Sequence, residues 1–147
     1  METRALLLRE NDRVKDNLTR ICEDLTDEQV NYEHEAVDER GIGNVVSHLY
    51  GSLANRTAIV TGAGPAVTPD APRTRGELIA FIDRTHDTIA QRLAKVTEEQ
   101  LAATVTIRDR ESTGIEAMMN SFSHAYRHVG NVLDARHLGG FETHVLG

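Results

Sequence analysis

Residues 115–138 read IEAMMNSFSHAYRHVGNVLDARHL. The apolar residues of this stretch recur every three or four positions, which is the period of an α-helix. Gly139 and Gly140 follow at once, and glycine adopts the positive φ that ends many helices at little steric cost. The sequence therefore predicts a long helix that ends at Leu138.

We expect this helix to be covered on two sides. One side is broad and apolar, whereas the side nearly opposite is small and polar, bears imidazoles, and has no Lys, Arg or Glu. A face open to solvent would normally carry charge, so the second side is expected to line a cleft. The apolar side comprises Ile115, Met118, Met119, Phe122, Tyr126, Val129 and Leu133, and the second side comprises Ala117, Ser121, His124, His128, Asn131 and Ala135.

Apolar periodicity predicts three further helices, at about Thr3–Asp24, Ile42–Val60 and Arg75–Val96. The 3 prolines of the chain all fall between residues 62 and 73, which predicts a loop there, and residues 104–107 alternate like a short extended segment. Helix starts are indicated by the Thr-x-x-Glu/Gln spacing of the capping box. This spacing begins at Thr26, Thr74, Thr97 and Thr113.

A length of 147 residues fits a single domain that spans residues 1–147. Four long helices with short connections predict an all-α fold, an antiparallel four-helix bundle. A weak internal repeat relates LTDEQV at residues 25–30 to VTEEQL at residues 96–101. The repeat is compatible with two similar helical hairpins, and equally with two capped turns.

Composition excludes several classes of function. The net charge is -7 and no block of Lys or Arg is present, so nucleic acid is not an expected partner. Cys22 is the single cysteine, which rules out an internal disulfide, a cysteine zinc site and a C-x-x-C redox pair. We expect it to be a partly buried thiol. The apolar run at residues 6–8 is too short for a signal peptide or membrane span, so we expect a soluble, cytoplasmic protein that does not engage a membrane.

Histidine spacing predicts a metal site. His124 and His128 are four residues apart, so they project from one side of the helix and are separated by roughly 6 Å of rise. Such a pair can hold one metal ion together with a third histidine from a neighbouring helix. His48, at the edge of the apolar stripe of its own helix, is the candidate for that third ligand. Taken alone, His48 is better interpreted as a structural histidine at the edge of the core, with one nitrogen hydrogen-bonded.

Two motifs carry a family resemblance: Ser47-His48-Leu49, and His124-x3-His128-Val129-Gly130-Asn131. Together with the Leu-Thr-Asp-Glu-Gln turn at residues 25–29, they resemble the DinB-like (YfiT-like) metalloenzyme superfamily. The resemblance implies a four-helix bundle, a homodimer, and a divalent metal held by His48, His124 and His128. Members often carry Gln where this chain has Asn131. We expect Asn131 to contact a bound cofactor, with Tyr126 and Arg127 as weaker candidates for substrate contacts.

The absence of a glutamate beside the His124 and His128 pair restricts the reactions that the site can support. The segment from His124 to His128 has no glutamate, unlike the zinc-protease pattern H-E-x-x-H, so peptide hydrolysis is disfavoured. A metal can still activate a bound water or hold a thiol as its thiolate. The resemblance implies the thiol route, because members include S-transferases that use mycothiol or bacillithiol.

We therefore expect a metal-dependent enzyme that transfers a low-molecular-weight thiol to an electrophile, or that hydrolyses a small-molecule substrate. Imidazole ligands suit several divalent ions; zinc or nickel is the first expectation, with iron as an option. Two alternatives remain open at this point. One is a non-enzymatic metal-binding or stress-response bundle in which the ion holds the helices together, and the other is a helical dimerisation protein with incidental histidines.

The remaining polar residues are assigned weaker roles. His86 is expected to be a buried, hydrogen-bonded structural residue, with an extra metal ligand as the alternative. A carboxylate from Asp38 or Glu39, in the turn before His48, could reach the site. Surface positions are expected for His34, His137 and His144.

Overall fold

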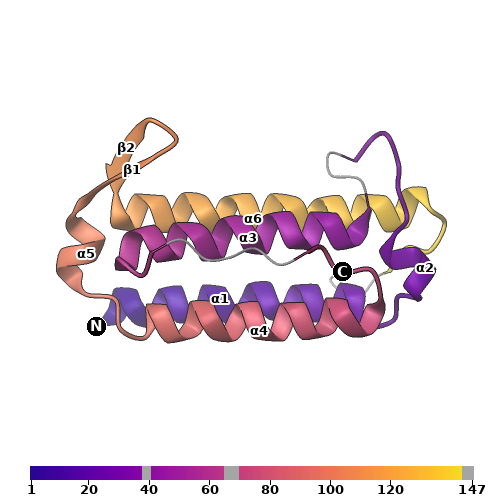
Figure 1. The fold of residues 1–147 in the computed structure, drawn as a ribbon, viewed down its shortest axis with the longest axis horizontal. Helices are drawn as coiled ribbons and strands as arrows, with labels where there is room; N and C mark the ends of the chain where they lie inside the picture. Colours follow the sequence, from indigo (N-terminus) through magenta and orange to yellow (C-terminus); the bar gives the residue numbers. More distant parts are fainter. Residues whose placement is uncertain (38–40, 65–69, 144–147) are drawn as a thin grey trace.

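A computed structural model of the chain describes residues 1–37, 41–64 and 70–143. Four long helices dominate it (Figure 1): α1 (Glu2–Cys22), α3 (Ile42–Thr61), α4 (Arg75–Leu93) and α6 (Gly114–Leu138). Two short helices, α2 (Asp27–Val30) and α5 (Glu98–Ala102), and an antiparallel hairpin of β1 (Thr104–Ile107) and β2 (Arg110–Thr113) stand between them. The predicted all-α four-helix bundle is confirmed.

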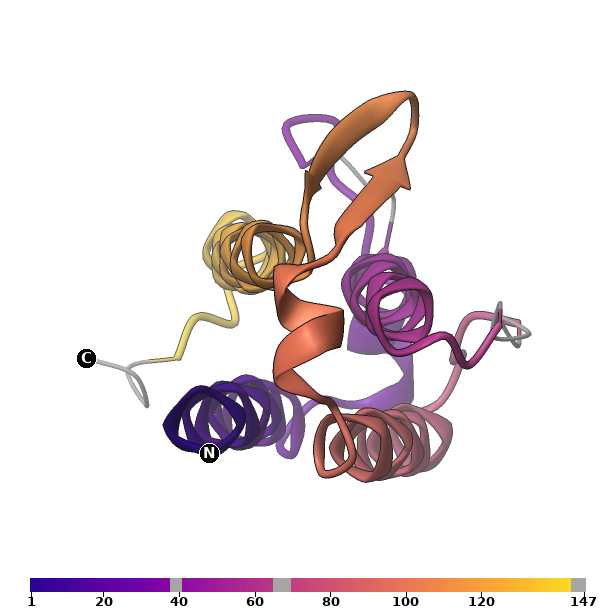
Figure 2. The same ribbon diagram turned by 90° about the vertical axis from the view of Figure 1, so that its left-hand side faces the viewer.

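The long helices form two antiparallel pairs that pack against each other (Figures 1 and 2). In the pair of α1 and α4, the Asn11 side chain donates a hydrogen bond to the backbone carbonyl of His86. In the pair of α3 and α6, His48 meets His124. The helices α3 and α4 lie side by side but run in the same direction, and the rings of Tyr50 and Phe81 meet edge to face between them. The antiparallel arrangement expected from the sequence therefore holds within each pair, and a parallel crossover joins the two pairs.

Local sequence signals account for the helix boundaries. Thr26 and Thr97 form complete capping boxes with Gln29 and Gln100, each side chain bonding the backbone N–H of the other residue. Thr74 and Thr113 also accept a hydrogen bond from the backbone N–H three residues on. Their boxes are incomplete, because Glu77 accepts from the backbone N–H of Arg73 and Glu116 accepts from the Thr113 hydroxyl. At the end of α6, the φ of 79° at Gly140 confirms the expected glycine stop.

Helix α6 has both of its predicted sides covered over most of its length. Apolar side chains such as Phe122 and Val129 are buried on one side, and Ser121 and His128 are buried on the other. Met119 is an exception to the prediction, because 62% of it is exposed. At 100° per residue, Met119 lies at the margin of the apolar arc, where the neighbouring helix no longer covers it.

The hydrophobic core fills the space enclosed by the four helices, and its fully buried members include Leu18, Leu49, Leu53, Ile82 and Met118. Cys22 lies in this core with no exposed surface, so it is more deeply buried than the sequence predicted. Within the described residues, no helix has the length and apolar character needed to cross a membrane.

Candidate metal centre

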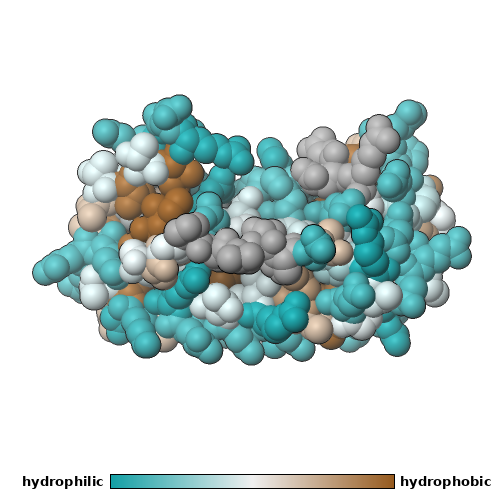
Figure 3. Space-filling view, viewed as in Figure 1, coloured by the Kyte–Doolittle hydropathy of each residue, from teal (hydrophilic) through white to brown (hydrophobic). Residues whose placement is uncertain are grey.

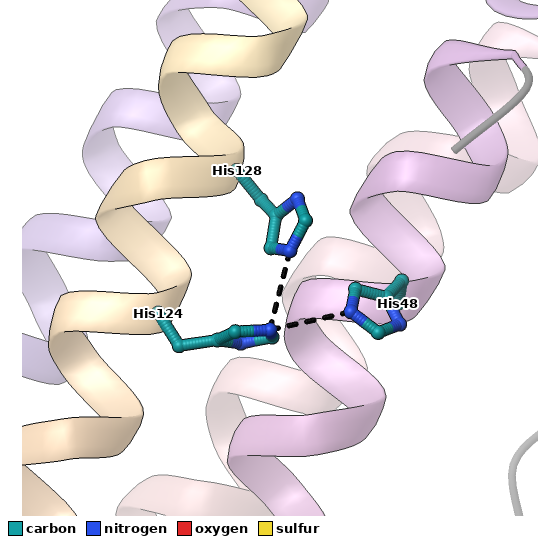
Figure 4. A group of neighbouring side chains, drawn as sticks. All are labelled: His48, His124 and His128. Carbon is teal, nitrogen blue, oxygen red and sulfur yellow. Dashed lines mark hydrogen bonds between the residues drawn. The ribbon is translucent and has the colours of Figure 1, made fainter. Parts of the chain in front are cut away.

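Three histidine side chains converge between α3 and α6 (Figure 4). Nε2 of His124 lies 3.3 Å from Nε2 of His48 and 3.2 Å from Nε2 of His128. The three ligand atoms lie within 4.8 Å of one another. The structure thus brings together the three residues that the sequence predicted as metal ligands.

The packing of α3 against α6 explains this convergence. The distance between two packed helices depends on the side chains at their contact, and α6 presents Ala117 and Ser121, both buried, on the histidine side. His124 and His128 are one turn apart on that side, and His48 faces them from α3 (Figure 4). His128 is 2% exposed, whereas His48 and His124 are half-buried. One edge of the cluster is therefore reachable from outside.

The arrangement fits a divalent ion with open positions. Imidazole nitrogens that bind one tetrahedral ion at about 2.0–2.1 Å lie roughly 3.3–3.4 Å from each other. The two short distances at His124, 3.3 and 3.2 Å, are close to this value. The ligands are neutral nitrogen donors, which suit zinc, nickel, copper and iron. Three donors leave at least one coordination position for water or another small ligand.

Electrostatics keep His124 in the form that binds metals. Burial is the main cause that lowers the pKa of His124 to about 4, and electrostatic interaction with His128, Arg56, His48 and Arg127 lowers it further. Its imidazole is therefore neutral at pH 7, and the neutral imidazole is the ligand.

Of the two weaker candidates for substrate contacts, one lies at the cluster and the other does not. Nη2 of Arg127 is 3.4 Å from Nε2 of His128. The Tyr126 hydroxyl instead donates to the Glu10 carboxylate, and Arg13 lies over its ring, so Tyr126 faces α1 as its position on the core side indicated.

No carboxylate belongs to the cluster among the residues that the structure describes. Asp38 and Glu39, considered from the sequence as possible neighbours, lie outside the described residues. Cys22 is not an available nucleophile, because burial raises the pKa of its thiol to about 12. Among the described residues, neither a carboxylate of the cluster nor the Cys22 thiol is therefore available as a nucleophile at this centre.

The other histidines lie away from the cluster. His86 bonds Asp12 at 2.7 Å and Asp87 at 3.2 Å between α1 and α4, which confirms the structural role and excludes the extra-ligand alternative. His34 is half-buried, and its ring accepts a hydrogen bond from the backbone of Ala36. His137 is exposed and contacts Glu142, and His144 lies outside the described residues.

Asn131 lies one turn beyond His128 on the same side of α6. Its Oδ1 atom is buried and has no hydrogen-bond partner within the described part of the chain. A buried acceptor without a partner is uncommon and is consistent with a missing donor. The contact between Asn131 and a bound cofactor stays a prediction.

A cavity of about 350 Å³ opens beside the histidines, and His124 forms part of its wall. It lies between α3, α6 and the hairpin, which stands over these two helices in Figure 2. The complete wall consists of Arg56, Ile107, Arg108, Arg110, Ser112, Ala117, Asn120 and His124. Sequence reasoning missed the three arginines, because they come from separate elements and form no motif along the chain.

Comparison with known proteins agrees with this architecture. A family model described as "Protein of unknown function (DUF1572)" matches residues 5–142. No curated protein sequence matches the chain. A DinB-like protein from Bacillus subtilis, 16% identical, has a TM-score of 0.65, with 95% of this chain and 92% of that chain covered.

A second solved structure is YfiT from Bacillus subtilis, described as "a probable metal-dependent hydrolase with an unusual four-helix bundle topology". It is 18% identical, with a TM-score of 0.71 and coverage of 97% of this chain and 90% of that chain. Likeness at these identities concerns the fold. The DinB-like fold expected from the two histidine motifs is therefore confirmed.

Proposed function

Because the chain belongs to the DUF1572 family and has the DinB-like fold, we propose that it is a metal-dependent enzyme whose divalent ion is held by His48, His124 and His128. The observation that carries this proposal is the convergence of three ring nitrogens beside a cavity of about 350 Å³. The description of YfiT as a probable metal-dependent hydrolase supports it. Zinc or nickel is the first candidate ion, and iron is the second.

The reaction that fits this centre best is the transfer of a low-molecular-weight thiol, such as mycothiol or bacillithiol, to a small electrophile. A divalent ion would supply Lewis acidity that lowers the pKa of a thiol or a water molecule. The described cluster offers no carboxylate to act as a general base. A thiol, with an ordinary pKa near 8.5, needs far less assistance than water, with a pKa of about 15.7.

Side chains of the chain would supply the remaining functions. The neutral imidazole of His124 leaves a ring nitrogen available as a ligand, and Arg127 places a positive charge beside His128. In the proposed transfer, the thiol proton passes to solvent, a sulfur–carbon bond forms, and the leaving group departs with its bonding electrons. Hydrolysis of a small substrate is the second candidate reaction, supported by the description of YfiT.

A purely structural ion that holds α3 against α6 is the main alternative. It needs no route from outside to the ion. The cavity beside His124 and the partial exposure of His48 and His124 support access by a small ligand instead.

Elemental analysis of the purified protein tests the metal site. We expect one divalent ion per chain in the wild type, and its loss in His48→Ala, His124→Ala and His128→Ala. His137→Ala is the matched control, because His137 is exposed and lies outside the cluster. A wild type that binds no zinc, nickel or iron after reconstitution would overturn the proposal.

Turnover assays on the same samples then test the reaction. Mycothiol and bacillithiol are incubated separately with a chromogenic aryl halide, and p-nitrophenyl esters are tested without thiol. Metal-dependent conjugation that is lost in His124→Ala supports thiol transfer. Ester cleavage alone supports hydrolysis, and a metal-loaded protein inactive in both assays supports the structural ion.

A further inference from the structure

Three positively charged side chains line the cavity beside His124. Arg56 projects from α3, Arg108 lies in the hairpin turn, and Arg110 belongs to β2. No acidic residue is part of the cavity wall within the described residues. The cavity is therefore strongly positive in a chain whose net charge is -7.

The three cavity arginines contrast with Arg136 and Arg4, whose side chains are bonded within the bundle. Arg136 bonds both carboxylate oxygens of Asp24, and Arg4 donates to a backbone carbonyl. Within the described residues, neither a hydrogen bond nor an ion pair satisfies the side chains of Arg56, Arg108 and Arg110. Burial and the nearby charge of Arg108 both lower the pKa of Arg56, so like charges face each other here without a counterion.

The hairpin turns its cationic face toward the cavity. Ile107 pairs with Arg110 across the strands, so their side chains share a face, and Ser112 lies on it two residues on. Glu111 lies between Arg110 and Ser112, so its side chain points to the opposite face. Ile107, Arg110 and Ser112 all line the cavity, and the acidic Glu111 does not.

The turn that carries Arg108 has an uncommon backbone. Arg108 and Asp109 have φ values of 50° and 64°, in the left-handed region that glycine normally occupies in such two-residue turns. At such a φ the Cβ atom lies close to the following carbonyl oxygen, so an arginine is disfavoured there relative to glycine. Glycine would relieve this strain but would remove the Arg108 guanidinium from the cavity wall.

We infer that the cavity binds an anionic group of the substrate, a carboxylate or a phosphate, through Arg56, Arg108 and Arg110. The planar guanidinium matches the oxygen pairs of both groups. His124 belongs to the same cavity wall. When the anionic group binds the arginines, the remaining part of a small molecule therefore lies beside the histidine cluster. This inference rests on the proposed function and names its substrate class: a small organic acid or phosphate ester with an electrophilic centre.

The size and surroundings of the cavity restrict the rest of the ligand. A volume of about 350 Å³ is at the lower end of the range for small-molecule sites. Ile107 and Ala117 add apolar wall beside the charges. Hydrophobic surface also gathers at the end of the molecule that carries the hairpin (Figure 3). A compact molecule with one anionic group and a short apolar portion fits these walls.

Titration of the full-length protein with inorganic phosphate and with benzoate tests the inference. Binding is followed by NMR at the side-chain Nε–H resonances of the arginines. We expect saturable shifts for Arg56, Arg108 and Arg110, and at least tenfold weaker binding in Arg56→Gln/Arg108→Gln/Arg110→Gln. The charge-matched control is Arg9→Gln/Arg20→Gln/Arg84→Gln, which alters three exposed arginines on α1 and α4. It should bind like the wild type.

Each outcome has a defined meaning. Tighter binding of phosphate assigns a phosphate ester, and tighter binding of benzoate assigns a carboxylic acid. Equal weakening in the two triple variants, or no shift at the cavity arginines, overturns the inference. Circular dichroism checks folding; if the triple variant does not fold, Arg56→Gln and Arg110→Gln are compared singly with Arg9→Gln.

Metal content measured on the same samples separates this inference from the proposed function. Metal binding without anion binding refutes the arginine site alone. Anion binding at the arginines in a protein that takes up no zinc, nickel or iron after reconstitution refutes the metal centre alone. Repeating the titration in His124→Ala/His128→Ala excludes binding of the anion to the ion itself.

Discussion

The Nε2 atoms of His48 and His124 lie 3.3 Å apart, although 76 positions separate the two residues in the chain. One residue belongs to α3 and the other to α6, so an ion bound between them would link the two helices. Any such ion binds only the folded chain, because the unfolded chain does not hold these nitrogens together. Metal binding and folding stability are therefore coupled.

Adding zinc or nickel to the metal-free protein should raise its melting temperature. Binding at a free metal concentration 100 times the Kd stabilises the folded state by about 2.7 kcal/mol, which corresponds to roughly 5–10 °C for a chain of this size. Differential scanning calorimetry with and without metal measures the shift. His124→Ala/His128→Ala should show little or none of it, and an equal shift in that variant would place the ion elsewhere.

Stability should depend on pH through Asp24. The hydrogen bonds from Arg136 hold the pKa of Asp24 below its ordinary value of 3.8. The ionised carboxylate thus stabilises the folded state above pH 3.8, and this contribution disappears as the pH falls through the lower folded pKa. The Arg136 side chain is 4% exposed and that of Asp24 is 57% exposed, so solvent screens part of the interaction.

Asp24→Asn should therefore lower the free energy of unfolding at pH 7 by about 1 kcal/mol. Urea denaturation at pH 7 and near pH 3 measures the change, and the difference from wild type should shrink at the lower pH. Asp134→Asn is the control, because Asp134 is an exposed carboxylate on the same helix as Arg136. A loss of stability for Asp24→Asn that does not vary with pH would refute the role of the ionised carboxylate.

Two glycines should respond oppositely to alanine. A Cβ atom on Gly43 would overlap the backbone carbonyl oxygen of Pro72, next to the start of α4, so Gly43→Ala should destabilise the fold by about 1–3 kcal/mol. A Cβ on Gly76 would meet nothing within 4 Å, so Gly76→Ala should stabilise α4 by up to about 1 kcal/mol. Urea denaturation compares the two variants, and similar effects from both would contradict the close approach at Gly43.

Asn131→Ala should separate a role in ligand binding from a role in stability. Removing a buried acceptor that has no partner costs the fold little, so we expect the free energy of unfolding to change by less than about 1 kcal/mol. If Asn131 contacts a bound cofactor, the variant should keep its metal but bind mycothiol or bacillithiol more weakly. Calorimetric titration of each thiol measures this, with Gly130→Ala as a control at the neighbouring position. Unchanged thiol affinity would remove Asn131 from the site.

Features that depend on neighbouring residues were predictable from the sequence. The 3.6-residue period located all four long helices, and the Thr-x-x-Gln spacing located the turns at Thr26 and Thr97. The pair of His124 and His128 was equally predictable, because residues four apart in a helix project from the same side wherever the helix lies. His48 could be added through its resemblance to a family motif.

Features that depend on long-range packing appeared only in the tertiary structure. Neither the parallel crossover between α3 and α4 nor the meeting of Arg56 with Arg108 and Arg110 leaves a pattern along the chain, because these contacts join residues far apart in sequence. The sequence by itself determined which segments are helical and which histidines are candidates to bind a metal together. Only the packing of α3, α6 and the hairpin decided that those histidines border a cationic cavity, since that cavity exists between elements and not within any of them.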